Sequence, residues 1–238
     1  MDVVSTADAP VRVYRHRLFT RLWHWVNAVA VIVLIGSGLM IFNAHPRLYW
    51  GHYGANFDPA WLELPRWPGW VTLPSRYSLS GARHWHLFFA LVLAFGLLLY
   101  MVWSLVNRHI QRDLRIRSRD LTARALCTDL KAHWALRFHD PHDPRAYNVF
   151  QKLSYVGVIF VLMPLLVLSG LALAPGMWAW LPDLFGGRQS ARSVHFIAMG
   201  AMTLFVIVHL TLVILAGAAN EVRSMITGWW RAPEEDHS

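Results

Sequence analysis

Cysteine is almost absent from this sequence, since Cys127 is the one thiol among 238 residues. One thiol excludes an internal disulfide framework and the C-x-x-C-H signature that attaches haem covalently. It also excludes iron–sulfur clusters and four-cysteine zinc sites, which need several thiolate ligands. Any haem in this protein must therefore be held by ligation and packing alone.

Charged residues are scarce too, at 15% of the chain against about 25% in an average soluble domain. Hydrophobic residues make up 55% of the chain and the mean hydropathy is +0.34, which favours a membrane protein. The first residues contain no short apolar stretch followed by a small-residue cleavage site, so we expect no removable signal peptide.

Four segments are long and apolar enough to span a hydrocarbon layer of about 30 Å. They cover about residues 19–42, 83–106, 153–174 and 193–218. Unpaired backbone groups in hydrocarbon cost several kcal/mol each, and four segments cannot close a barrel, so each span must be a helix. The predicted fold class is an all-α integral membrane protein, a four-transmembrane-helix bundle that forms one domain over residues 1–238.

The basic residues outside the spans indicate the orientation. Fourteen lie in the N-terminal segment, the 107–149 loop and the C-terminal tail, against four in the two opposite loops. The positive-inside rule then predicts that both termini are cytoplasmic, in a bacterial inner membrane. This topology also explains the net charge of +8, so we expect no nucleic-acid partner.

Two loops have patterns of their own. The loop at about residues 43–82 is rich in Trp, Pro and Gly, and is either a docking surface or a cap that lies on the membrane. Residues 118–138 have the pattern of an amphipathic surface helix between basic flanks.

Five of the 13 histidines lie within the spans or at their edges: His24, His84, His86, His195 and His209. Ionisable residues inside a membrane are costly, so each of these is a functional hypothesis. The last two are 14 residues apart, close to four helical turns, and so share one helix face at levels about 21 Å apart. Two stacked ligands on one helix are what two haems in one bundle require.

Depth in the membrane supplies a partner for each of these ligands. The first span starts on the cytoplasmic side and the second on the outer side, so His24 lies level with His209, and His86 with His195. His84 lies about 200° from His86 around its helix, so the two cannot both point into the bundle, and the R-x-x-H spacing from Arg83 selects His86. Two neutral imidazoles fill both axial positions of haem iron, which favours electron transfer over oxygen activation. Zinc would need about four ligands at one level, where each level offers two.

Three of the four histidines follow an arginine by three residues: Arg21 with His24, Arg83 with His86, and Arg192 with His195. This spacing puts both side chains on one helix face, with the arginine nearer to water. There a guanidinium can pair with anionic haem propionates through charge-assisted hydrogen bonds. Snorkelling to the interface also explains arginines at span ends, but not the repeated spacing.

A specific resemblance covers all four spans, in RLWHWVNAVAVIVLIGSGL, RHWHLFFALVLAFGLLLY, YNVFQKLSYVGVIFVLMPLLVLSGLAL and SARSVHFIAMGAMTLFVIVHL. These segments resemble the cytochrome b subunits of nickel-iron hydrogenases, formate dehydrogenases and thiosulfate-reductase-like complexes, from about residue 12 to 230. The resemblance implies two non-covalent haems b, with His24, His86, His195 and His209 as axial ligands of iron. It also implies electron transfer between a periplasmic partner and the membrane quinone pool. YNVFQK and NEVRSMITGWW are more similar to the thiosulfate-reductase-like branch, often paired with molybdenum enzymes.

Three functions remain open at this point. The first is an electron-transfer subunit, without catalytic residues, that serves a periplasmic molybdenum enzyme, hydrogenase or electron carrier. The second is a self-sufficient dihaem oxidoreductase that passes electrons from superoxide to quinone. The third is a haem-free membrane anchor or transporter whose histidines relay protons or pack between helices. The sequence offers no unique quinone motif.

Overall fold

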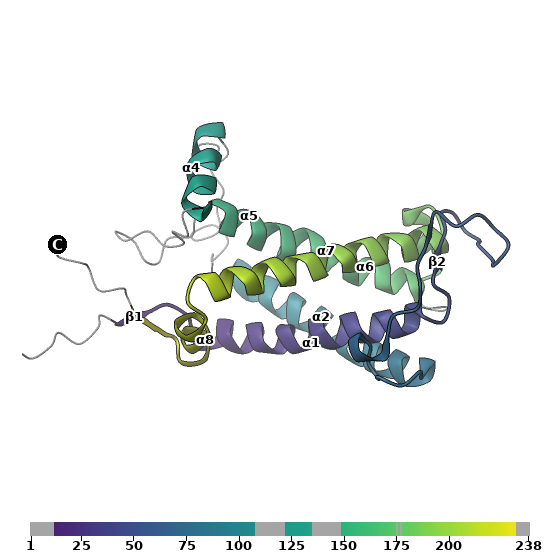
Figure 1. The fold of residues 1–238 in the computed structure, drawn as a ribbon, viewed down its shortest axis with the longest axis horizontal. Coiled ribbons are helices and arrows are strands. Elements are labelled where there is room, and N and C mark those ends of the chain that lie inside the picture. Colours follow the sequence, from purple (N-terminus) through teal and green to yellow (C-terminus); the bar gives the residue numbers. More distant parts are fainter. Residues whose placement is uncertain (1–11, 108–121, 135–148, 175, 177, 232–238) are drawn as a thin grey trace, which may run out of the picture.

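The computed structural model describes residues 12–107, 122–134, 149–174, 176 and 178–231. Four helices in this part of the chain are long and apolar enough to cross a membrane: Leu18–Phe42, Leu79–Val106, Val149–Leu173 and Arg188–Leu215. They are α1, α2, the continuous run α5–η3–α6, and α7 (Figure 1). The predicted fold class, a bundle of four membrane-spanning helices, is confirmed.

Capping and glycine geometry set the helix ends. Helix α2 begins before the predicted position 83 because the side chain of Ser78 accepts a hydrogen bond from the backbone N–H of Gly81. Helix α7 stops at Leu215, before the predicted end at 218, because Gly217 takes a left-handed conformation with a φ of 99°. The chain then turns into a separate helix, α8 (Ala218–Thr227).

The third span is not a uniform α-helix. It runs as α5 (Val149–Gly157), a π-helical turn η3 (Val158–Leu162) and α6 (Met163–Leu173). Pro164 lies in the first turn of α6, where it has no N–H to donate and its ring would clash with the carbonyl four residues earlier. The wider π turn directly before the proline accommodates both effects.

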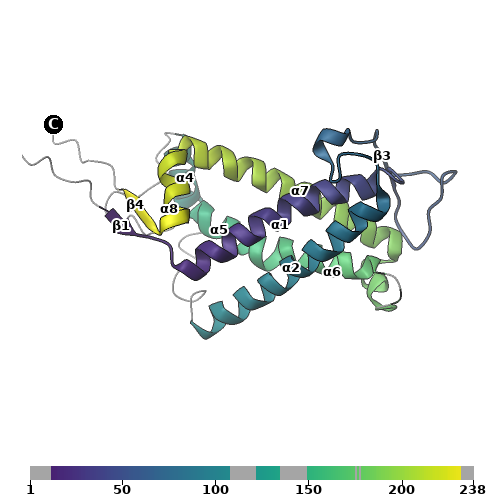
Figure 2. The same cartoon turned by 90° about the horizontal axis from the view of Figure 1, so that it is seen from below.

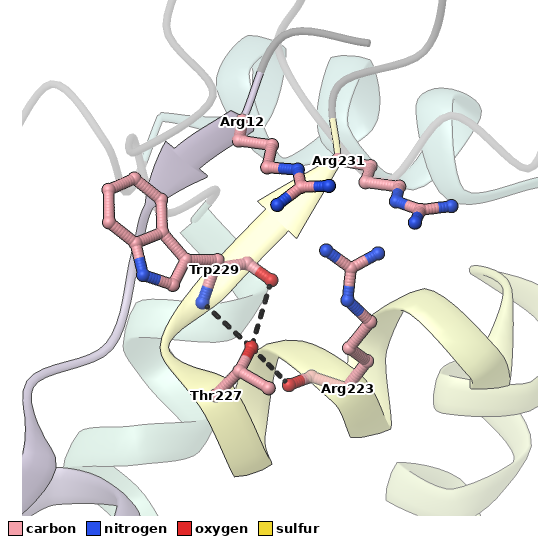
Figure 3. A pocket seen from close by; sticks show the side chains of 5 residues that line it. All are labelled: Arg12, Arg223, Thr227, Trp229 and Arg231. Atoms are coloured by element: carbon pink, nitrogen blue, oxygen red, sulfur yellow. Dashed lines mark hydrogen bonds between the residues drawn. The ribbon is translucent and has the colours of Figure 1, made fainter. Parts of the chain in front are cut away.

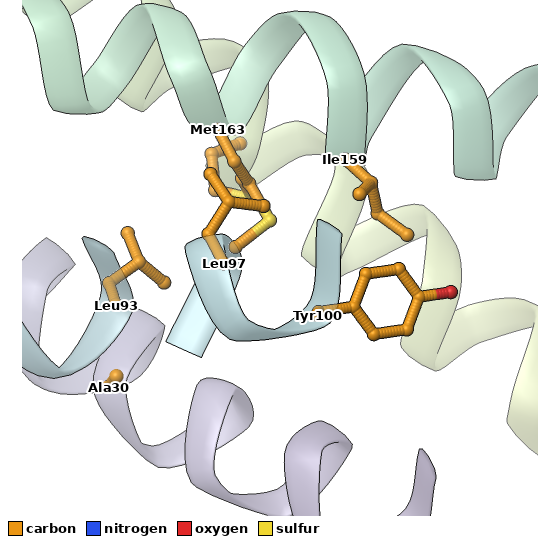
Figure 4. Packing of buried hydrophobic residues seen from close by; sticks show 7 residues of the cluster. Ala30, Leu93, Leu97, Tyr100, Ile159 and Met163 are labelled. Carbon is orange, nitrogen blue, oxygen red and sulfur yellow. The ribbon is translucent and has the colours of Figure 1, made fainter. Parts of the chain in front are cut away.

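The four spans form two closely packed pairs, α1 with α2 and α6 with α7. Figures 1 and 2 show the pairs side by side along the long axis of the molecule. Between them lies the apolar core, a cluster of buried residues from all four spans: Ala30, Leu93, Leu97, Tyr100, Ile159, Met163 and Met202 (Figure 4). In Figure 4 the side chains of α2 point towards those of η3 and α6, so this cluster joins the two pairs.

The two ends of the bundle carry different small elements. At one end, here called the loop end, β2 (Arg47–Leu48) pairs antiparallel with β3 (Leu62–Glu63). The 3-10 turns η1 (Gly69–Val71) and η4 (Leu181–Phe185) lie in the loops that join the spans. At the opposite end, the terminal end, β1 (Arg12–Tyr14) pairs antiparallel with β4 (Trp229–Arg231) beside α8 (Figures 1 and 2).

The loop between the second and third spans contributes one described helix, α4 (Ala123–Trp134). A helix is therefore confirmed within the predicted range 118–138, and the rest of that range lies outside the described residues. The Asp129 carboxylate accepts a hydrogen bond of 2.9 Å from the backbone N–H of Phe150, which joins α4 to the start of α5.

Candidate functional site

The four candidate ligands meet in two pairs. The ring centres of His24 on α1 and His209 on α7 are 6.3 Å apart, and this terminal pair lies towards the terminal end. The ring centres of His86 on α2 and His195 on α7 are 6.2 Å apart, and this loop pair lies towards the loop end. These are the pairs that matching by depth predicts. His84 lies elsewhere: it is exposed, and its Nδ1 contacts the Ser80 carbonyl at 2.9 Å, as a donor.

The separation within each pair fits one metal ion between two imidazoles. An imidazole nitrogen lies about 2.0 Å from a bound transition metal and about 1.1 Å from the centre of its own ring, so rings on opposite sides of one metal have centres about 6.2 Å apart. Within the described residues, no three His, Cys, Asp or Glu side chains form a group that could hold a metal ion. Each pair therefore suits a metal whose other ligands come from a cofactor ring, as in haem.

The loop pair is held by matching contacts on the two helix pairs. Nδ1 of His86 is 3.0 Å from Oγ of Ser37 on α1, and Nδ1 of His195 is 2.9 Å from Oγ of Ser169 on α6. Each serine is followed by a glycine, and a Cβ added to Gly38 or Gly170 would lie 3.3 Å from Cε1 of the neighbouring histidine. The glycines thus let the Cε1–Nδ1 edge of each imidazole come close to the backbone of the adjacent helix.

The terminal pair has a different environment. Nδ1 of His24 is buried and has no hydrogen-bond partner in the part of the chain that the structure describes. Its ring meets that of Trp25 edge to face, with centres 5.2 Å apart. The ring of Phe205, one turn before His209 on α7, stacks on it at 5.7 Å with an angle of 15° between the planes. Each histidine of the terminal pair thus contacts an aromatic ring, whereas each histidine of the loop pair contacts a serine hydroxyl.

An apolar layer separates the two pairs. Met202 is buried on α7, seven residues from each of His195 and His209, so it faces the same side between them. It belongs to the core cluster with Leu93 and Leu97, which project between the helix pairs in Figure 4. Water is therefore excluded from the centre of the bundle.

The three predicted propionate-binding arginines occupy different surroundings. Arg21 donates a hydrogen bond to the carbonyl of Ile226 in α8, and its Nε is buried without a partner. Arg192 donates to the carbonyls of His45 and Arg47, and so holds the 43–78 loop against α7. Arg83 is exposed at the start of α2. The structure thus gives Arg21 and Arg192 anchoring contacts that the spacing to histidine did not predict.

Serines at the start of α7 also anchor this loop. Ser193 Oγ donates to the Tyr49 carbonyl at 2.7 Å and accepts from Nε1 of Trp61 at 2.9 Å. The N–H of Gly51 donates to Ser190 Oγ at 2.7 Å. These bonds lie within two turns of His195, so the loop and the loop pair share one rigid support.

Comparison with known proteins identifies the family. The family model for prokaryotic cytochrome b561 matches residues 15–228, which include all four histidines and both ends of the bundle. The chain belongs to the prokaryotic cytochrome b561 family. No solved structure matches it.

Three relatives of this cytochrome illustrate the range of the family. A putative protein-methionine-sulfoxide reductase subunit, YedZ1, of Azospira oryzae is 32% identical over 84% of the chain and 90% of the relative. A probable Ni/Fe-hydrogenase B-type cytochrome subunit of Azotobacter chroococcum is 25% identical over 91% of the chain and 88% of the relative. The putative cytochrome YdhU of Escherichia coli is 27% identical over 95% of the chain and 78% of the relative.

Sequence reasoning missed Ser37 and Ser169 in this cytochrome. Both are fully buried, and both stand in the same short pattern, Ser-Gly-Leu, near the loop end of their helices. The repeated pattern was the available signal. The pattern alone does not indicate a contact with histidine, because small residues in membrane helices also serve helix packing.

The terminal end of the cytochrome carries a basic hollow of about 580 Å³, lined by Arg12, Arg223, Thr227, Trp229 and Arg231 (Figure 3). Arg12 and Arg231 lie directly opposite each other in the β1–β4 ladder. Its lining side chains, all within the described part of the chain, include no carboxylate. Nearby, burial and the charges of Arg15, His24 and Arg21 lower the pKa of His16 to about 4, so His16 is neutral at pH 7.

Proposed function

We propose that this protein is a dihaem b-type cytochrome that carries electrons between a periplasmic partner and the membrane quinone pool. The observation that supports this proposal most strongly is the distance between the histidine ring centres, 6.3 Å in one pair and 6.2 Å in the other, at two levels of one bundle. Family membership supports haem b as the cofactor. In this proposal His24 and His209 ligate one iron, and His86 and His195 the other.

Haem bound between such histidines supplies one-electron redox chemistry. The two imidazoles of each pair would both bind the metal of a haem held there, and would so keep oxygen from binding to it. Core residues such as Met202 keep water out between the levels. Arg21, Arg83 and Arg192 remain the proposed propionate partners, each one turn from its histidine and nearer to its end of the bundle.

The proposed orientation places the terminal end, with both chain termini, in the cytoplasm, and the loop end in the periplasm. The membrane is then the bacterial inner membrane. The two histidine levels on α7 are about 21 Å apart, which spans most of a hydrocarbon layer of about 30 Å. One histidine pair would then lie near each face, and a haem held there would be within reach of quinone in the lipid.

A partner-dependent role is favoured over a self-sufficient oxidoreductase. The YedZ1 relative is named a subunit of a methionine-sulfoxide reductase, and the Azotobacter relative a subunit of a hydrogenase. We infer that this chain serves a periplasmic oxidoreductase or electron carrier in the same manner. At the loop end, the exposed side chains of Tyr53 and Phe57 are available to such a partner.

Electron transfer is tested with the purified holoprotein in proteoliposomes. Reduced quinol is added, and haem reduction is followed in the α-band before and after a membrane-impermeant oxidant is supplied. We expect the quinol to reduce both haems and the oxidant then to reoxidise them. The His84→Ala variant is the control and should behave in the same way. The proposal is wrong if no quinol reduces the haems and no quinone reoxidises them.

A further inference from the structure

The two buried serines beside the loop pair make identical sets of contacts. Ser37 Oγ is 2.6 Å from the carbonyl oxygen of Val33, and Ser169 Oγ is 2.6 Å from that of Leu165, each four residues earlier in the same helix. Each serine also meets a histidine Nδ1 on the neighbouring helix, at 3.0 Å and 2.9 Å. The arrangement occurs once in the α1–α2 pair and once in the α6–α7 pair.

These contacts fix the direction of the hydrogen bonds. A carbonyl oxygen can only accept, and a serine hydroxyl has one proton, so each hydroxyl donates to its own helix carbonyl. The serine oxygen must then accept from the histidine, whose Nδ1 therefore carries the proton. Nε2 of His86 and of His195 then carries no proton, and an unprotonated ring nitrogen is the one that binds a metal.

At His24 in the terminal pair there is no such contact, since its buried Nδ1 has no hydrogen-bond partner among the residues that the structure describes. The two levels of the bundle thus differ in the groups that support their ligands. A hydrogen bond from Nδ1–H to an acceptor makes an imidazole a stronger electron donor to its metal, and such outer contacts tune redox potential.

We propose that Ser37 and Ser169 are positioning residues that hold the tautomer of the loop pair and lower the redox potential of the haem bound there. This inference rests on the proposed haem function. It names two residues that would make the redox potential of the haem at the loop pair differ from that at the terminal pair. It requires both serines to act on one and the same haem, from opposite helix pairs.

The chain offers a matched control in Ser104 on α2. Its side chain is fully buried like those of the two serines, but its hydroxyl has no hydrogen-bond partner among the described residues. Ser104→Ala removes the same hydroxyl group from a membrane-spanning helix, but it removes no contact with a histidine. Ser37→Thr and Ser169→Thr keep the hydroxyl and serve as conservative rescues.

The test is an optical redox titration of the holoprotein, with electron paramagnetic resonance of the oxidised haems. We expect Ser37→Ala and Ser169→Ala each to shift the same haem to higher potential, the double variant to shift it further, and the other haem to stay unchanged. Each serine contacts Nδ1 and leaves Nε2 of the histidine free to bind the metal, so we expect a shift without loss of haem. The threonine variants should restore the potential, and Ser104→Ala should move neither component.

The inference is overturned if two haems bind and the alanine variants leave both potentials unchanged, as Ser104→Ala should, or shift the potentials of both haems alike. It is also overturned if the two serine variants act on different haems. A chain that binds no haem at all overturns the proposed function as well, so the two failures are distinguishable by haem content.

Discussion

Glycine at two positions should be required for the loop pair, and the structure sets the size of the effect. A Cβ at Gly38 would lie 3.3 Å from Cε1 and 3.7 Å from Nδ1 of His86, and a Cβ at Gly170 would lie at the same two distances from His195. The optimal separation of two carbon atoms is about 3.5–4.0 Å, so each ring or helix must move by a few tenths of an ångström. The serine hydrogen bonds oppose that movement.

Two opposing effects decide whether alanine at these positions lowers or raises the stability of the protein. Overpacking costs about 1–3 kcal/mol, and alanine gains about 1 kcal/mol over glycine in a helix. Gly38→Ala and Gly170→Ala should therefore lower stability by about 0–2 kcal/mol. Gly200 on α7 is the control, since in the described part of the chain no atom beyond its own helix turn lies within 4 Å of its added Cβ. Gly200→Ala should raise stability by about 1 kcal/mol.

The assay is thermal unfolding of the holoprotein in detergent, followed by Soret absorbance, together with a redox titration. Both loop-pair variants should unfold at lower temperature than Gly200→Ala and disturb one haem component. If all three variants were equally stable and left both haems unperturbed, the close approach of glycine to imidazole would be refuted.

Further substitutions address the ligand pairs and the loop. Alanine at either histidine of the terminal pair should alter one haem, and alanine at either histidine of the loop pair should alter the other haem. Spectra and redox titration measure this. If the two histidines of one pair altered different haems, the pairing would be contradicted. His84→Ala should leave both spectra unchanged, because this side chain bonds its own helix. Arg192→Gln should destabilise the protein by about 2–3 kcal/mol and speed proteolysis of the 43–78 loop, since bonds from a charged donor to two carbonyls are weakened. Arg76→Gln, an exposed change in the same loop, is the control and should have no such effect.

The spans and the ligand pairing were predictable because both follow from distances along a helix. A hydrocarbon layer fixes the length of each apolar segment, and a rise of about 1.5 Å per residue fixes the level of each histidine. The structure brings His24 to His209 and His86 to His195, the combination derived from these levels. The ligand role of the four residues stays a prediction.

Features that depend on contacts between helices were not predictable in this way. The bonds from Ser37 to His86 and from Ser169 to His195 join helices whose relative rotation no single segment specifies. The β1–β4 ladder joins the two ends of the described chain, where strands of three residues give almost no periodic signal.

Local backbone conformation accounts for the other differences. The π turn before Pro164 and the break at Gly217 each come from one residue within or beside an apolar run. Hydropathy does not detect such a residue. The glycine at 217 could have marked the helix end, because glycine is favoured just after a helix.

The central claim is most directly tested by the haem content of the purified chain. A pyridine haemochrome assay, with protein quantified by amino-acid analysis after full reconstitution, gives the number of non-covalent haems b per chain. Two histidine pairs with ring centres 6.3 Å and 6.2 Å apart predict two haems per chain, and one haem after alanine replaces both members of either pair. Clearly fewer than two haems in the unaltered protein would contradict the account.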